Sequence, residues 1–507
     1  MSDQINQFTK TLKEFDIEMD EIIFKTGHVN TLDNLLAYRY LMEAIGRSST
    51  IKQLTLRYLT TPEQWDLIIK ALAQNTSITK IDFNANSLAH IAKALKAHEV
   101  LTECKVTLPV QLPATDIEDF ASALTSSKSL TSFELHGTGI RTAVPSTRLV
   151  SIFKAIKEHR GLVTCKFHSL SFAPETGRTV ASMIRYNEAL NSLAFVHCDI
   201  DLLTESLCEV LKLNTSIAEL DLASSNFTFA NVTKLLQIFK ENTTITVLTL
   251  DEINLGNKHV VQQLGALLKS STTLKKLSLV NCRLDIINFK LDLAKNKSLE
   301  WLSLAKNTVS GEWFRVFLRR SNVRHLCLDD CTIDPSYGRF VFQELERNHA
   351  LTSLHMKNID LNESALSSLG SMLRENDTLQ VLHVKRGTAT SIPIQPVLMA
   401  LATNKTLVAL HIEKIHEQYH PEWEMIHKLA VLKANNSLVG LTINGEVDED
   451  VEKRLRENRE RYTGVVAFLK LMAKRQDYFF ALFPMEIWTN ICSHIEGADI
   501  RKIFSTE

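Results

Sequence analysis

Residues 274–284 read LKKLSLVNCRL, and residues 299–309 repeat the same arrangement as LEWLSLAKNTV. In both stretches apolar residues occupy positions 1, 4, 6 and 11, and Asn or Cys occupies position 9. This pattern predicts a short strand followed by a turn. Fifteen such blocks can be placed, and they begin at residues 51, 78, 101, 130, 162, 190, 217, 245, 274, 299, 323, 351, 379, 407 and 438. Their mean spacing of about 28 residues leaves room for a helix after each turn.

A second signal marks the end of each repeat. Asn stands three residues before nine of the blocks, and Asn tolerates the left-handed backbone conformation that ends many helices. Apolar residues such as Val260, Leu264 and Leu267 recur at helical spacing between blocks. Each repeat is therefore predicted to be a strand, a turn, an amphipathic helix and an Asn stop. The nine residues are Asn75, Asn187, Asn214, Asn242, Asn296, Asn348, Asn376, Asn404 and Asn435. Seven of them begin an Asn-x-Ser/Thr triplet, which we interpret as structural and not as a glycosylation acceptor.

These features resemble the ribonuclease-inhibitor-like class of leucine-rich repeat proteins, and the resemblance covers roughly residues 50 to 460. It implies an α/β fold, a horseshoe-shaped solenoid of about 15 strand–helix repeats, with a concave parallel sheet and convex helices. Because a solenoid must cover its apolar ends, we expect helical caps on both sides. The predicted domains are a helical N-terminal cap (1–50), the solenoid (51–460) and a helical C-terminal cap (461–507).

Composition and charge exclude several classes of function. The 57 Lys and Arg nearly balance the 58 Asp and Glu, which argues against a nucleic-acid binder held by a general basic field. The sequence contains no run of 18 apolar residues, so we predict no membrane-spanning helix. The first residues lack the profile of a signal peptide. The eight cysteines are scattered, which indicates reduced thiols in a cytosol-like compartment. No cofactor-binding fingerprint is present, so we predict no cofactor.

The candidate binding surface lies on the predicted concave side, where positions 3, 5 and 7 of each block point outward. His occupies position 5 in three successive blocks, and neighbouring strands lie about 4.8 Å apart, so these imidazoles should form a contiguous column. The predicted partner-binding residues are His325, His355, Lys357, His383, Lys385, Arg386, His411 and Lys414. Further back the same face carries acidic residues, which are Glu219, Asp221, Asp251 and Glu252.

We interpret this face as a docking surface for a protein of complementary charge, with pH sensitivity from its histidines. The alternative is a solvated face with incidental polar residues. Histidine is a common zinc ligand, but a straight column does not imply tetrahedral geometry, so we predict no metal ligands.

One string matches the zinc-hydrolase pattern H-E-x-x-H, and it reads His416-Glu417-Gln418-Tyr419-His420. A zinc metallohydrolase needs both histidines on one helical face, with the Glu beside a metal-bound water. Pro421 follows directly and disfavours helical geometry at His420. We therefore predict a loop, no catalytic residues and a protein that is not an enzyme, and a zinc metallohydrolase stays as the remote alternative.

The segment 483–500 differs from the repeats and begins Phe483-Pro484-Met485-Glu486-Ile487. It is similar to the opening of an F-box, which begins L-P-x-E-I/L and continues with regularly spaced apolar residues. The resemblance implies that Phe483, Pro484, Glu486, Ile487 and Ile491 bind the Skp1 adaptor of cullin ubiquitin ligases. Only 24 residues follow Phe483, about half of the family's module. The alternative is a helix that folds back onto the cap.

Repeats joined to an F-box-like tail resemble effector proteins that intracellular bacterial pathogens deliver through type IV (Dot/Icm-type) secretion. The resemblance implies action in the host cytosol, and Phe504, Glu496 and Asp499 are compatible with a C-terminal secretion signal. The first hypothesis is therefore a non-enzymatic effector that binds a host protein on its concave face. The second is a substrate adaptor that recruits Skp1, and a cytosolic regulator of eukaryotic origin stays open.

Overall fold

The computed structural model describes residues 21–25, 32–59, 61–85, 87–109, 111–137, 146–286, 296–333, 337–359, 363–385, 394–413, 435, 437–438, 440–443, 453, 455–456 and 458. The chain divides into two compact units, which are Met1–Ser278 (unit 1) and Leu279–Glu507 (unit 2).

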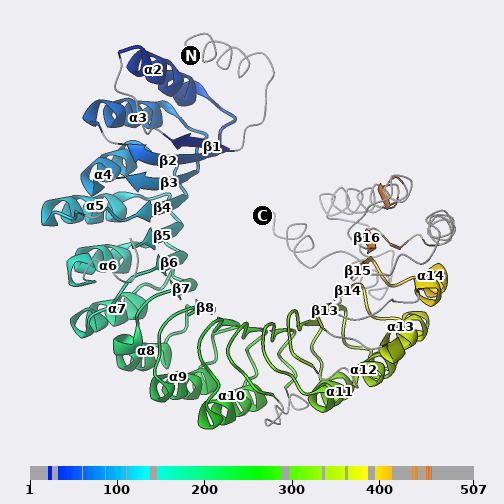
Figure 1. Ribbon diagram of the computed structural model, residues 1–507. Coiled ribbons are helices and arrows are strands. Elements are labelled where there is room, and N and C mark those ends of the chain that lie inside the picture. Colours follow the sequence, from blue (N-terminus) through cyan, green and yellow to red (C-terminus); the bar gives the residue numbers. More distant parts are fainter. Residues whose placement is uncertain are drawn as a thin grey trace, which may run out of the picture. The chain divides into compact units, whose positions relative to one another are not determined.

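Unit 1 is a parallel sheet with helices along one side (Figure 1). Its strands pair in sequence order, and they are β1 (Glu21–Lys25), β2 (Gln53–Leu59), β3 (Lys80–Ala85), β4 (Glu103–Thr107), β5 (Ser132–His136), β6 (Thr164–His168), β7 (Ser192–Val196), β8 (Glu219–Asp221), β9 (Val247–Thr249) and β10 (Lys276–Ser278). Its helices are α2 (Leu32–Arg47), α3 (Pro62–Gln74), α4 (Leu88–Ala97), α5 (Ala114–Ser126), α6 (Val150–Glu158), α7 (Pro174–Tyr186), α8 (Thr204–Leu211), α9 (Phe229–Glu241) and α10 (Lys258–Ser270), with single 3-10 turns η2 (Ser146–Leu149) and η3 (Asp201–Leu203).

Unit 2 repeats the same arrangement (Figure 1). Its strands also pair in parallel and in sequence order, and they are β11 (Trp301–Ser303), β12 (His325–Cys327), β13 (Ser353–Lys357), β14 (Val381–Lys385), β15 (Ala409–Glu413) and β16 (Gly440–Ile443). Its helices are α11 (Gly311–Arg320), α12 (Gly338–Leu345), α13 (Glu363–Glu375) and α14 (Ile394–Thr403).

Each of the fifteen predicted blocks contains one strand, from β2 to β16. The α/β class and the leucine-rich repeat solenoid are therefore confirmed. The structure also adds a strand that the pattern did not predict, because β1 precedes α2 within the expected N-terminal cap and pairs with β2. Among the described helices, none combines the length and the apolar character needed to cross a bilayer.

Burial alternates along the strands as a sheet with one covered face requires. In β13 the side chains of Leu354 and Met356 are buried under the helices, whereas those of His355 and Lys357 are partly exposed. We call the side of each sheet away from its helices the open sheet face. It is the surface that the sequence predicts as concave.

The turn after each strand has a recurrent backbone conformation. The residue at position 8 has a positive φ, between 53° and 61°, in eight repeats. These residues are Ser169, His197, Ser224, Glu252, Asn281, Lys306, Asp330 and Asn358. Position 9 then turns inward, where Cys198, Cys282 and Cys331 are buried thiols outside any disulfide, as core packing predicts.

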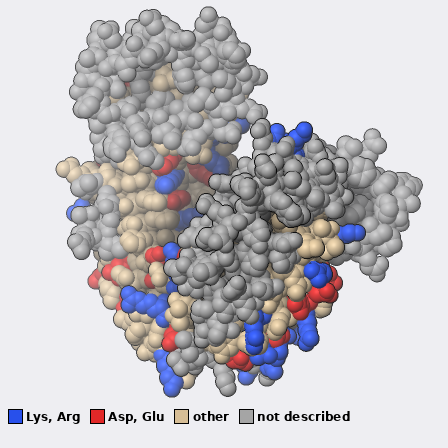
Figure 2. All heavy atoms as spheres, turned by 45° about the vertical axis from the view of Figure 1, so that its right-hand side comes forward, with Lys and Arg blue, Asp and Glu red and all other residues tan. Residues whose placement is uncertain are grey.

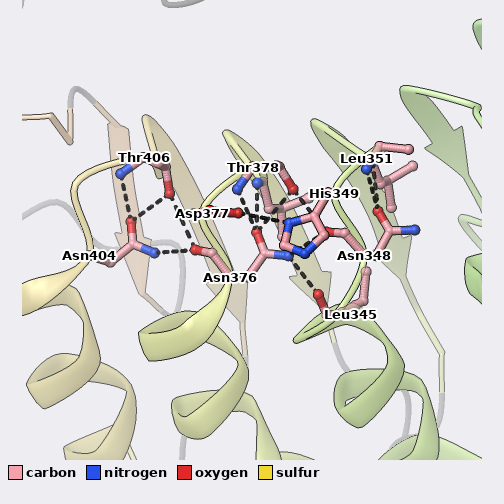
Figure 3. A network of polar contacts seen from close by, with 11 residues as sticks. Leu345, Asn348, His349, Leu351, Asn376, Asp377, Thr378, Asn404 and Thr406 are labelled. Atoms are coloured by element: carbon pink, nitrogen blue, oxygen red, sulfur yellow. Dashed lines mark hydrogen bonds and ion pairs between the residues drawn. The ribbon is translucent and has the colours of Figure 1, made fainter.

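The Asn stops form a ladder that joins successive repeats (Figure 3). The Asn376 side-chain amide donates to the carbonyl oxygens of Leu345 at 2.6 Å and of Asn348 at 3.1 Å. Its Oδ1 accepts from the backbone N–H groups of Thr378 at 3.0 Å and Leu379 at 2.7 Å. Asn348 and Asn404 make equivalent bonds, and His98 and His159 take the same place in earlier repeats.

The ladder corrects the predicted reason for the Asn stops. Asn75, Asn187 and Asn242 cap their helices with negative φ angles of −82°, −89° and −72°, so their backbone is not left-handed. Asn is used because its side chain has both donors and an acceptor. The structural interpretation of the Asn-x-Ser/Thr triplets is supported, since the Thr378 hydroxyl also donates to the Asn348 carbonyl oxygen.

Candidate functional site

Three histidines lie side by side on the open sheet face of unit 2. His355, His383 and His411 come from β13, β14 and β15 and are register partners. The ring centroids of His355 and His383 are 4.2 Å apart, and those of His383 and His411 are 4.1 Å apart. The repeat spacing therefore places the three imidazoles in one row, which we call the histidine column.

Burial changes the expected charge of the histidine column. Burial, together with repulsion from positive charge at its neighbours His355, His411 and Lys357, lowers the pKa of His383 to about 3. Burial also lowers the pKa of His355, although the carboxylate of Asp329 opposes this. The prediction of pH sensitivity is therefore wrong for His383, whose ring stays neutral until the solution is strongly acidic.

Charged groups of both signs flank the histidine column. Lys357 follows His355 along β13, and its register partner on β14 is Lys385. The next register partner, on β15, is Glu413. The Lys357 backbone N–H donates to Asp329 Oδ1 at 2.8 Å. Acidic and basic side chains are likewise interspersed over the described surface in Figure 2.

The other predicted partner-binding residues do not join the column. The register partner of His325 is Ser353, and the strand neighbour of His355 is Cys327, so His325 lies in a different row. Three predicted side chains lie outside the described residues, and they are those of Lys385, Arg386 and Lys414.

Two predicted motifs also fall outside the described residues. They are the string His416-Glu417-Gln418-Tyr419-His420 and the F-box-like segment 483–500, which includes Phe483, Pro484, Glu486, Ile487 and Ile491. The expected C-terminal cap, 461–507, lies outside them as well.

A second polar group gathers on the open sheet face of unit 1. Glu134 and His136 stand on β5, and His168 is the register partner of His136 on β6. The two imidazole rings are stacked, with centroids 4.2 Å apart and planes inclined by 8°. His136 Nε2 makes a short hydrogen bond to Glu134 Oε1, which also lies 3.2 Å from His168 Nε2. We call these three residues the Glu-His-His cluster.

The electrostatics of this cluster leave one ring nitrogen unsatisfied. The hydrogen bond from His136 lowers the pKa of Glu134, so the carboxylate is ionised at neutral pH. Burial lowers the pKa of His168 to about 4, so its ring is neutral. His168 Nε2 is buried and makes no hydrogen bond among the described residues, although Glu134 Oε1 lies 3.2 Å away.

Gly137 sets the approach of the two histidine strands. Its N–H donates to the carbonyl oxygen of His168 at 2.8 Å. A Cβ at position 137 would lie 2.3 Å from the carbonyl oxygen of Ser169, which is far below van der Waals contact. Glycine is therefore required for the backbone to come this close without displacement.

The sequence contains a signal for this cluster. Glu134 occupies position 5 of its block, and His136 and His168 occupy position 7 of theirs, so all three belong to the predicted outward positions. The histidine column repeats one residue type at one block position, which makes it evident in the sequence. The Glu-His-His cluster mixes two block positions and two residue types, so no single repeated residue marks it.

Comparison with known proteins adds remote similarity. No family model matches this sequence. A curated relative, "NACHT, LRR and PYD domains-containing protein 5" of Bos taurus, is 23% identical over 335 residues. The match covers 63% of this chain and 30% of that protein, so this chain spans less than a third of the relative's length.

Two solved structures are also similar. The leucine-rich repeat-containing protein LegL7 from Legionella pneumophila is 13% identical, with a TM-score of 0.38 over 70% of this chain and 96% of that one. TLR13, from its complex with ssRNA13, is 16% identical, with a TM-score of 0.43 over 73% of this chain and 58% of that one. The fold is a leucine-rich repeat fold. The repeat pattern and the strand register establish it.

Proposed function

We propose that this protein is a non-enzymatic binding protein that holds a protein partner on the open sheet face of unit 2. The observation that supports this is the histidine column, in which three partly exposed imidazoles from consecutive strands stand in register. Core packing does not need polar rings on this face, because the apolar side chains of the same strands face the helices. Solenoids of this class commonly bind partners on their extended sheet face.

The chemistry of the column indicates what the partner segment offers. A neutral imidazole carries one donor and one acceptor, so the row can pair with polar side chains or with an extended backbone. The partly exposed Lys357 beside it favours a carboxylate. We therefore propose a polar partner segment with at least one acidic residue opposite Lys357.

We expect the double variant His383→Ala, Lys357→Glu to bind this partner at least about tenfold more weakly than the wild type, since it removes a central ring and reverses a neighbouring charge. His383 Nδ1 is buried without a hydrogen-bond partner among the described residues, so its removal breaks no hydrogen bond at that atom. The measurement is affinity capture from cytosol extract, followed by titration of the purified protein that was captured.

The matched control is His349→Ala, Lys405→Glu, which changes the same residue types at exposed positions after α12 and α14. This control should retain full affinity. If the site variant and the wild type bind every captured protein with equal affinity, the histidine column is not the binding site.

A second candidate is a substrate adaptor, favoured by the order of Phe483, Pro484, Glu486 and Ile487 in the sequence. In this case the repeats hold a target while the tail recruits Skp1. Purified Skp1 should then be retained by the wild type and lost by Pro484→Ala, Ile487→Asp. Failure of the wild type to retain Skp1 would exclude the adaptor.

We also propose, from sequence resemblance, that the protein is a bacterial effector that acts in the host cytosol. The extract used for capture should accordingly be prepared from a host cell. A partner present only in bacterial extract would contradict this origin.

A further inference from the structure

We propose that the Glu-His-His cluster of unit 1 is a binding site for one divalent transition-metal ion, with Zn²⁺ as the best match. The three residues offer one carboxylate oxygen and two imidazole nitrogens, and these ligand atoms all lie within 4.8 Å of one another. The site is on a different unit from the proposed partner surface, so it does not rest on the proposed function.

The ligand set selects the type of ion. Two imidazoles and one carboxylate suit Zn²⁺ and its neighbours in the first transition series, whereas Mg²⁺ and Ca²⁺ prefer oxygen ligands alone. The Glu134 carboxylate supplies a negative charge opposite the ion, and the two imidazoles each present a ring nitrogen within reach of that carboxylate.

One of the two distances to the carboxylate already fits a tetrahedral site. Zn²⁺ lies about 2.0–2.2 Å from nitrogen and oxygen ligands, so two ligands of a tetrahedral site are about 3.4 Å apart. His168 Nε2 and Glu134 Oε1 are 3.2 Å apart. The shorter contact between His136 Nε2 and Glu134 Oε1 has to lengthen, and the two stacked imidazole rings have to turn out of their parallel arrangement so that both ring nitrogens face one ion.

The unsatisfied nitrogen of His168 is an independent reason for a ligand here. A buried polar atom without a partner costs free energy, and coordination of an ion by His168 Nε2 would remove that cost. His136 Nε2 already points to the same carboxylate oxygen. A metal ion that takes the place of this hydrogen bond satisfies all three side chains at once.

Solvent can reach the site and complete the coordination. The side chains of Glu134, His136 and His168 are 27%, 24% and 22% exposed. An ion can therefore enter from the open sheet face, and water supplies the fourth ligand, as in zinc sites with three protein ligands.

Two neighbouring lysines limit the affinity without closing the site. Lys105 and Lys166 flank Glu134 in register on β4 and β6. Lys105 Nζ lies 3.9 Å from Asp82 Oδ2, which offsets its charge, and the Lys166 side chain is exposed, where solvent screens it.

The experiment is titration of chelator-treated full-length protein with ZnCl₂ by isothermal calorimetry, and with CoCl₂ by visible absorption spectroscopy. We expect one Zn²⁺ per chain and the absorption bands of nitrogen- and oxygen-coordinated Co²⁺. His136→Ala should weaken binding by at least about a hundredfold, because even loss of a residue that only supports a ligand costs 10–100-fold. Glu134→Gln, which keeps the shape of the side chain, should weaken it as well.

The matched control is His349→Ala, which removes an exposed histidine of unit 2 and should bind Zn²⁺ like the wild type. Circular dichroism checks that each variant is folded. If His136→Ala does not fold, the Zn²⁺ affinity of Glu134→Gln tests the proposal. Binding of Mg²⁺ in place of Zn²⁺, absence of stoichiometric Zn²⁺ in the wild type, or unchanged binding by Glu134→Gln would overturn the proposal.

Discussion

Replacement of Phe167 by alanine is expected to lower the free energy of unfolding by about 3–5 kcal/mol, the range for a fully buried aromatic side chain. Phe167 is completely buried on β6, between β5 and β7. Its ring centroid lies 5.3 Å from that of Phe195, 5.5 Å from that of Phe153 and 6.5 Å from that of Phe172. Alanine would leave a cavity among the rings of Phe153, Phe172 and Phe195. These rings cannot fill the cavity without losing their other contacts.

The measurement is urea-induced unfolding followed by circular dichroism, analysed for more than one transition because repeat proteins can unfold in parts. The control is Phe229→Ala, since Phe229 is 43% exposed at the start of α9 and should cost below about 1 kcal/mol. A loss below that of Phe229→Ala would show that this aromatic group does not stabilise unit 1. Because His168 follows Phe167 directly, the same variant should also bind Zn²⁺ more weakly if the proposed site exists.

Asn376→Ala is expected to cost about 3 kcal/mol, because it leaves several buried backbone groups without partners, each of which costs about 1–3 kcal/mol before relaxation. The side chain is 4% exposed and bonds to two carbonyl oxygens and two N–H groups (Figure 3). Alanine can replace none of these bonds. The same urea titration measures the loss.

The neighbouring residue provides the control for Asn376. The Asp377 side chain is 70% exposed and pairs with His349 at 3.1 Å, so Asp377→Ala should change stability by only about 0–1 kcal/mol. Equal losses for the two variants would contradict a stabilising role of the ladder. Asn376→Asp should also destabilise, because it places a negative charge against the carbonyl oxygens of Leu345 and Asn348.

The sequence predicts the repeats well because their period is set by simple packing. Leu354 and Met356 alternate with His355 and Lys357, and this alternation alone assigns the two faces of β13. The period of the repeats also predicts the position of each Asn stop. It does not predict the conformation of the Asn, because the decisive bonds join residues about 28 to 31 positions apart and no local rule contains them.

Site properties that depend on neighbouring side chains were harder to predict. The spacing of 28 residues predicts that His383 stands between His355 and His411. It does not predict that burial keeps the ring of His383 neutral. The Glu-His-His cluster depends on the close approach that Gly137 permits, which becomes visible only when the backbone of the next repeat is present. Strand β1 lacks the block consensus altogether, so periodicity could not find it.

The Asn ladder also determines how this chain can change its length. Asn348, Asn376 and Asn404 follow one another at intervals of 28 residues, and the amides of Asn376 and Asn404 each donate to the backbone carbonyl of the Asn before them. Excision of residues 349–376 would therefore bring Asn348 next to Asp377. Asn348 could then make the hydrogen bonds that Asn376 makes in the intact chain. Excision of one residue fewer would put every later amide out of step. Gain or loss of a complete module is thus the change that this architecture tolerates best, and it would lengthen or shorten the row of imidazoles by one ring.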